Sequence, residues 1–138
     1  MTQQDKSNYF KGLLILIGKD KKISDLEKVN LKRLSKILGF NKEFCENAIS
    51  ELLENEYIIE TPPQFSDKEI AKAFIIDGIK IAFADKELHI FELNWLKSVA
   101  EKNSLEKDWC IEKYNENLLR NSDPIKFEIE KLLEIQQE

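Results

Sequence analysis

The sequence contains little proline, glycine, cysteine or histidine. Among its 138 residues are three prolines, four glycines, two cysteines and one histidine. Scarce proline and glycine, with abundant Lys, Glu, Leu and Ile, are typical of a helical protein. Two widely separated cysteines do not indicate a disulfide scaffold, and His89 alone leaves a histidine-rich zinc site without a set of ligands.

Long apolar runs and blocks of basic residues are also missing. The longest apolar runs, such as 13–17 and 73–76, are far shorter than the ~20 residues that span a bilayer, so no membrane insertion is expected. The 26 acidic and 21 basic residues are interleaved and give a net charge of -5, which shows no basic footprint for nucleic acid. Residues 1–6 lack the apolar core of a secretory signal, so we expect a cytoplasmic protein.

The hydrophobic pattern predicts one all-α domain over residues 1–138, with about seven helices. Ser24 and Glu27 form a capping-box pattern that begins a helix, and Gly39 supplies its stop. Further helices are predicted at 9–18, 42–55, 70–84, 90–103, 106–119 and 123–135. Ser66 is the expected N-cap before 70–84, and Asp123 with Pro124 is the expected start of the last helix.

The chain also repeats itself with an offset of sixty-five residues. Asp20, Glu27 and Cys45 align with Asp85, Glu92 and Cys110, without a gap between residues 12 and 45. We therefore predict two pseudo-symmetric halves, residues 9–60 and 66–120, that share one core, followed by a C-terminal helix at 123–136. The alternative is that amphipathic helical hairpins of similar length match by chance.

The repeated element has the form D-x-x-[IL]-x-x-x-E after an apolar helix, and it resembles the TerB-like (tellurite resistance protein TerB) family. The likeness covers roughly residues 9–120 and is clearest over 81–100. Lys21 and Lys86 stand where that family has glycine after the aspartate. The resemblance implies an all-helical arrangement in two halves, a role in tellurite resistance and stress response, and an acidic, metal-associated surface formed here by Asp20, Glu27, Asp85 and Glu92.

These four carboxylates suit a hard divalent cation, Ca²⁺ or Mg²⁺ rather than Zn²⁺, because such ions take oxygen ligands. The alternative is structural: Glu27 and Glu92 would cap helices, and Asp20 and Asp85 would satisfy loop amides. The leading hypothesis is a non-enzymatic module that binds a divalent cation, a protein partner, or both, through this surface.

Two other functions stay open. One is a metal-independent interaction domain with Phe91, Trp95 or Tyr114 as anchors if these side chains are exposed. The other is a hydrolytic enzyme that uses paired carboxylates, which requires a pocket with a perturbed carboxyl group. Cys45 and Cys110, at matching positions, are expected to face the core.

Overall fold

The computed structural model describes residues 1–18, 23–54, 61–83, 90–118 and 125–136. Within these ranges the chain forms seven α-helices and no strand, which confirms the predicted all-α class. The helices are α1 (Gln3–Ile17), α2 (Asp25–Ile37), α3 (Lys42–Glu54), α4 (Lys68–Phe83), α5 (Ile90–Lys102), α6 (Lys107–Leu118) and α7 (Glu128–Gln136). No helix in the described ranges is long and apolar enough to cross a membrane.

The helix bounds follow the sequence repeat closely. Adding sixty-five to the bounds of α2 gives the bounds of α5, and α1 and α3 correspond in the same way to α4 and α6 to within one residue. The chain also turns alike after α2 and α5: Gly39 and Ser104 both have positive φ, at 86° and 59°. Phe40 N–H then donates to the Ser35 carbonyl at 2.9 Å, as Leu105 N–H does to Ala100 at 2.8 Å.

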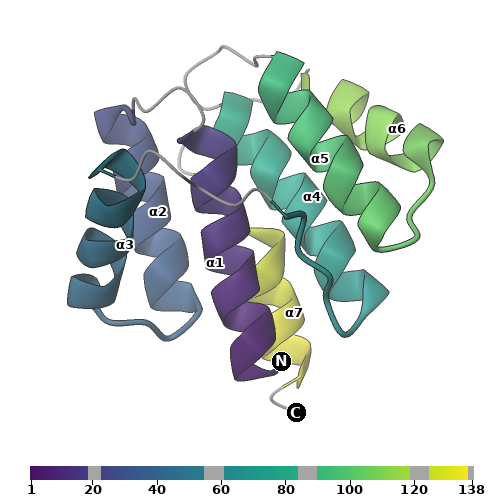
Figure 1. Cartoon of the computed structure of the whole chain (residues 1–138). Helices are drawn as coiled ribbons and strands as arrows, with labels where there is room; N and C mark the ends of the chain where they lie inside the picture. The colour runs from purple at the N-terminus through teal and green to yellow at the C-terminus, as the bar shows by residue number, and fades with distance from the viewer. Residues whose placement is uncertain (19–22, 55–60, 84–89, 119–124, 137–138) are drawn as a thin grey trace.

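Helices α1 and α4 lie side by side in the centre of the bundle (Figure 1). Helices α2 and α3 cover one side, α5 and α6 cover the other, and α7 packs against α4. The largest fully buried side chains come mainly from the two central helices and include Tyr9, Phe10, Leu13, Phe74, Ile75 and Ile79. The apolar character of α1 and α4 is explained by this position, since neighbours surround both helices.

Most local predictions are confirmed. Ser24 and Glu27 form the capping box at the start of α2, with Glu27 N–H donating to Ser24 Oγ at 3.1 Å and Ser24 N–H to Glu27 Oε1 at 2.9 Å. Cys45 and Cys110 are buried in the core. The matched cysteines are therefore small core residues, as the repeat indicates.

Three predicted helix starts are wrong. Helix α1 begins at Gln3, before the predicted start at 9, with Thr2 as its N-cap. Ser66 does not cap α4, because its hydroxyl donates to Asp5 at 2.5 Å, and Asp67 accepts from Glu69 N–H instead. The predicted cap at Asp123 and Pro124 lies outside the described residues, but residues 125–127 are not helical and α7 begins at Glu128. The first N–H groups of α7 bond to Asp77 of α4, so a distant helix supplies the cap.

Candidate functional site

The predicted acidic site is only partly within the described residues. Asp20 and Asp85 lie outside them. Glu27 and Glu92 both occupy the third position of a helix, α2 and α5, and each is 7% exposed. The two carboxylates that can be located are thus nearly buried and equivalent in the repeat.

The two halves place these carboxylates at one end of the molecule. Helices α1 and α4 end there, and α2 and α5 begin there (Figure 1). We call this the helix-start end and define it by residues 24–29, at the start of α2, and residues 90–94, at the start of α5. Among the described residues, no group of three or more His, Cys, Asp or Glu side chains could hold a metal ion.

The capping alternative holds for Glu27, whose Oε1 accepts the Ser24 N–H as the reciprocal half of the capping box. Carboxylates in a first turn are also favoured by the positive end of the helix dipole. Glu92 occupies the corresponding position of α5, and it too has interaction partners.

The helix-start end also carries large apolar side chains in contact with solvent. Ile90 and Phe91 are 61% and 63% exposed, and on α2 Leu26 and Val29 are 42% and 53% exposed. Leu26 aligns with Phe91 in the repeat, so both halves expose an apolar side chain at the same place. Of the three aromatic residues considered as anchors, Phe91 is exposed.

The other two aromatic residues considered as anchors, Trp95 and Tyr114, are less exposed than Phe91. Trp95 is 3% exposed, and its indole N–H donates to the Gly12 carbonyl at 3.0 Å. Tyr114 is half-buried, with its ring centroid 5.3 Å from that of Phe83. Both side chains stabilise packing between helices.

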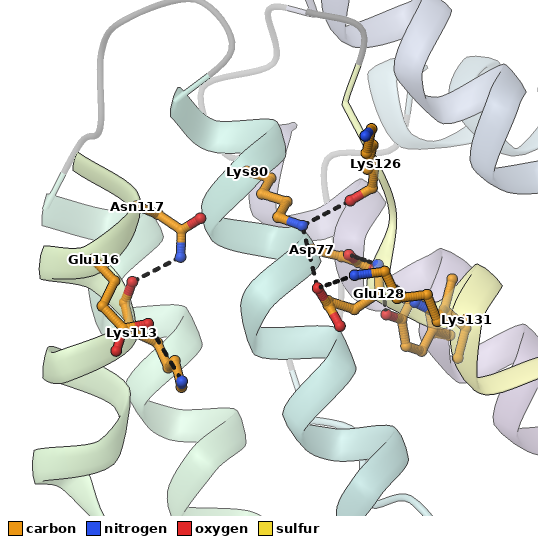
Figure 2. Close-up of polar contacts among 10 residues, drawn as sticks. Asp77, Lys80, Lys113, Glu116, Asn117, Lys126, Glu128 and Lys131 are labelled. Carbon is orange, nitrogen blue, oxygen red and sulfur yellow. Dashed lines mark hydrogen bonds and ion pairs between the residues drawn. The ribbon is translucent and has the colours of Figure 1, made fainter. Parts of the chain in front are cut away.

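A second polar cluster lies inside the bundle, around Asp77 of α4. Its Oδ2 accepts the Tyr9 hydroxyl at 2.5 Å and the Ile129 N–H at 3.2 Å, and its Oδ1 accepts the Glu128 N–H at 2.7 Å. Asp77 therefore caps α7 from another helix. One turn along α4, Lys80 donates to the Lys126 carbonyl at 2.7 Å and lies 3.5 Å from Glu128 (Figure 2).

Burial controls the electrostatics of this cluster. Asp77 is completely buried, and loss of water raises its pKa to about 7, although the Tyr9 hydroxyl, two backbone N–H groups and Lys80 all lower it. Burial and the neighbouring Asp77 carboxylate raise the pKa of Tyr9 well above its ordinary value. Both groups can therefore hold protons at neutral pH, and the pair can share one across its short hydrogen bond.

Helical spacing alone does not predict this cluster. The spacing of Lys72, Asp77 and Lys80 favours a polar side of α4, but Asp77 has no exposed surface. A usable signal is present, since Asp77 stands between Ile75-Ile76 and Gly78-Ile79 in the most apolar helix. A carboxylate in such a segment is rarely buried without hydrogen-bonding partners.

Comparison of the chain with protein-family models, with curated proteins and with solved structures finds no match. The resemblance to the TerB-like family therefore stays a prediction that depends on the repeated acidic element. Evidence about function comes from the local geometry of the helix-start end and of the cluster around Asp77.

Proposed function

We propose that this protein is a TerB-like binding module whose helix-start end contacts a protein partner. The observation that carries the proposal is the exposure of Ile90 and Phe91, with Leu26 exposed at the matching position of α2. Covering large apolar side chains that contact water makes the free energy of binding more favourable, and aromatic residues often act as anchors in interfaces. The chain carries a net charge of -5, so the fitting partner has apolar residues flanked by basic ones.

A divalent cation is the second part of the proposal. Asp20, Glu27, Asp85 and Glu92 would supply oxygen ligands for Ca²⁺ or Mg²⁺. Support comes from the location of Glu27 and Glu92 at the same end of the bundle and at equivalent positions (Figure 1). The role in tellurite resistance and stress response, and the cytoplasmic location, depend on the family resemblance and the composition.

The partner surface can be tested by site-specific photo-crosslinking in the cells that produce the protein. A photoreactive residue at position 91 should give a discrete adduct with one protein, identified by mass spectrometry. The matched control is the same residue at Ile111, a 41% exposed position on α6. With the purified partner, the Ile90→Ser, Phe91→Ser double variant should bind at least about 10-fold more weakly, whereas Ile111→Ser should not. Equal labelling at both positions would contradict the proposal.

The cation can be tested by thermal unfolding with Ca²⁺, Mg²⁺ or Zn²⁺. A cation that binds only the folded state stabilises it by about 2.7 kcal/mol at a hundred times its dissociation constant, so the unfolding temperature should rise by several degrees. The rise should disappear in the Asp20→Ala, Asp85→Ala double variant. Asp25→Ala, which removes an exposed first-turn carboxylate, is the matched control and should keep it. An unchanged unfolding temperature in the wild type would remove the cation from the proposal.

The hydrolytic alternative has less support. Asp77 has a strongly raised pKa, but the carboxylate is fully buried and its oxygens accept hydrogen bonds from Tyr9, Glu128 and Ile129. A groove beside α1 is lined by Asn8, Lys11, Gly12, Ile15, residues 61–64 and Lys102, and none of these residues carries a carboxylate. An open groove on α6 is lined by Asp108, Glu112 and Glu116, but it does not include Asp77. A substrate would need both an open pocket and the perturbed acid in it.

A further inference from the structure

The C-terminal residues 125–136, which we call the C-terminal strap, are attached to the bundle by polar groups of other helices as well as by buried apolar side chains. Arg33 of α2 donates to the Ile125 carbonyl at 2.7 Å, and its guanidinium lies 5.3 Å from the centre of the Phe127 ring. Lys80 donates to the Lys126 carbonyl, and Asp77 accepts the first two N–H groups of α7. The attachment is therefore concentrated at the beginning of the strap.

Apolar burial follows the same gradient. Ile125, Phe127 and Ile129 are 6%, 1% and 0% exposed, whereas Leu132 and Leu133 are half-buried and Ile135 is 69% exposed. Beyond its first turn, α7 holds to the bundle through partly buried side chains. Polar and apolar contacts with the bundle are therefore both concentrated at the start of the strap, beside Asp77.

We propose that the C-terminal strap is a proton-linked regulatory element, which docks on α4 while the Asp77–Tyr9 pair holds an extra proton and releases when that proton passes to water. Asp77 is fully buried, and release of the strap would remove two of its three hydrogen-bond donors and admit water. A carboxylate loses much more hydration free energy on burial than a neutral carboxyl group does. The two N–H groups of the strap favour the ionised form, but burial has the larger effect on the pKa of Asp77, so the protonated pair is the form that favours docking. This inference does not depend on the helix-start end.

The charges around Asp77 are few. Tyr9 faces it from α1, and Lys80 lies one turn along α4. On the strap, Glu128 is 3.5 Å from both Lys80 and Lys131, so its charge is largely offset. Arg33 of α2 contacts the strap at Ile125 and Phe127.

The two remaining neighbours of α4 contact it through apolar and aromatic side chains. On the α5 side, Leu96 lies against Gly78, and on the α6 side Tyr114 lies against Phe83. Of the described groups, Lys80 is therefore the cation that lowers the pKa of the Asp77 carboxyl group. Its side chain is 19% exposed and also serves the Lys126 carbonyl and Glu128, which limits how far it offsets the buried charge.

The raised pKa of Asp77 agrees with stronger docking of the protonated form. Burial raises the pKa of Asp77 from 3.8 to about 7 in the docked state. The docked state therefore binds more protons than a water-exposed Asp77 between these values, and docking weakens as the pH rises through 7. If undocking exposed Asp77 completely, linkage would give a fall of up to about 30-fold in the docking equilibrium from pH 5.5 to pH 8.

Hydrogen exchange of the full chain at several pH values tests the proposal. After correction for intrinsic exchange rates, protection of the amides at 129–136 should fall by up to about 30-fold between pH 5.5 and pH 8. Amides of α1 such as Leu13 and Leu14, which exchange through global unfolding, should be better protected than those of the strap at every pH. Asp77→Asn should remove the pH dependence at 129–136, and Glu130→Gln, which removes an exposed charge from the strap itself, should preserve it.

A second measurement keeps the test valid if Asp77→Asn does not fold. The carboxyl carbon of Asp77 in the wild type should titrate near pH 7, and Tyr9→Phe, which removes a donor that lowers the pKa, should move this midpoint and strap release to higher pH. A midpoint near 4, a flat profile at 129–136, or a strap that is as well protected as α1 at every pH would each overturn the proposal.

Discussion

Gly12 in α1 and Asp77 in α4 occupy the same position of the repeat, yet they meet the rest of the molecule differently. At Gly12 the helices approach so closely that a Cβ atom would lie 2.7 Å from Phe74 Cε2. The Gly12 carbonyl accepts the indole N–H of Trp95, so α5 packs directly on α1. At Asp77 the side chain instead receives the start of α7.

The residue of α2 that corresponds to Trp95 in the repeat is also different. Trp95 of α5 aligns with Asn30 of α2. Asn30 is 3% exposed, and its Nδ2 has no hydrogen-bond partner among the described residues, whereas the Trp95 indole is bonded to α1. The two similar halves thus share helix bounds and turns but differ in their contacts at these two positions, which we call the Gly12 junction and the Asp77 junction. At the Gly12 junction, Trp95 packs on α1. At the Asp77 junction, a buried carboxylate binds the start of the C-terminal strap.

Removing the carboxylate should have the largest effect on this difference. Asp77→Ala leaves two N–H groups of α7 and the Tyr9 hydroxyl without their acceptor and should lower the free energy of unfolding at pH 5.5 by about 3 kcal/mol. Urea denaturation measures this change. Glu51→Ala, an exposed site on α3, is the control and should stay within about 0.5 kcal/mol of wild type. An equally small effect at Asp77 would show that the Asp77 junction does not depend on its polar group.

The pH dependence of stability should be the next largest effect. Because the pKa of Asp77 is about 7 in the folded protein and 3.8 in the unfolded reference, the folded state binds more protons between these values. The contribution is complete below pH 4 and is lost as the pH rises through 7. Between pH 5 and pH 8 the free energy of unfolding should fall by roughly 2 to 3 kcal/mol relative to the same measurement on Asp77→Asn.

Asp5 does not interfere with this measurement. Burial raises the pKa of Asp5, but hydrogen bonds from Ser66 and Thr2 outweigh burial and leave it below its ordinary value. Its stabilising contribution is therefore lost only as the pH falls below about 4. Parallel pH profiles for wild type and Asp77→Asn would contradict the assignment to Asp77.

The two junctions also differ in how far a sequence reveals them. The capping box at Ser24 and the stop at Gly39 use residues a few positions apart, and the structure contains both. The start of α7 is not predictable in this way, because its cap is Asp77, fifty-one residues before Glu128. The role of Ser66 escapes prediction for a similar reason, since Asp5 lies sixty-one residues away from it.

The residues of the candidate site also differ in how far the sequence predicts them. Helical spacing identifies Glu27 and Glu92 as first-turn carboxylates, whereas the exposure of Phe91 is a condition that only the structure settles. The apolar neighbours of Asp77 within α4 indicate that it is buried, but the groups that satisfy it come from α1 and α7 and cannot be identified from α4 alone. Local hydrogen bonding can be predicted from spacing, but a polar group satisfied across the bundle requires the tertiary arrangement.

The smallest expected effect compares the two turns that follow α2 and α5. Gly39 and Ser104 have the same role at φ 86° and 59°, a region that favours glycine over residues with a Cβ atom. A Cβ atom at Gly39 would meet no atom of the described residues within 4 Å, so Gly39→Ala tests conformational strain alone and should cost about 1 kcal/mol of unfolding free energy.

Ser104→Gly should act in the opposite direction and stabilise the protein by about 0.5 kcal/mol, because relief of strain exceeds the added freedom of the unfolded chain. Ser104→Ala is the matched control: it removes the hydroxyl, keeps the Cβ atom and should leave the urea midpoint nearly unchanged. If Ser104→Gly were destabilising, the second turn would owe its geometry to the serine itself, and the two turns would be alike in shape but not in cause.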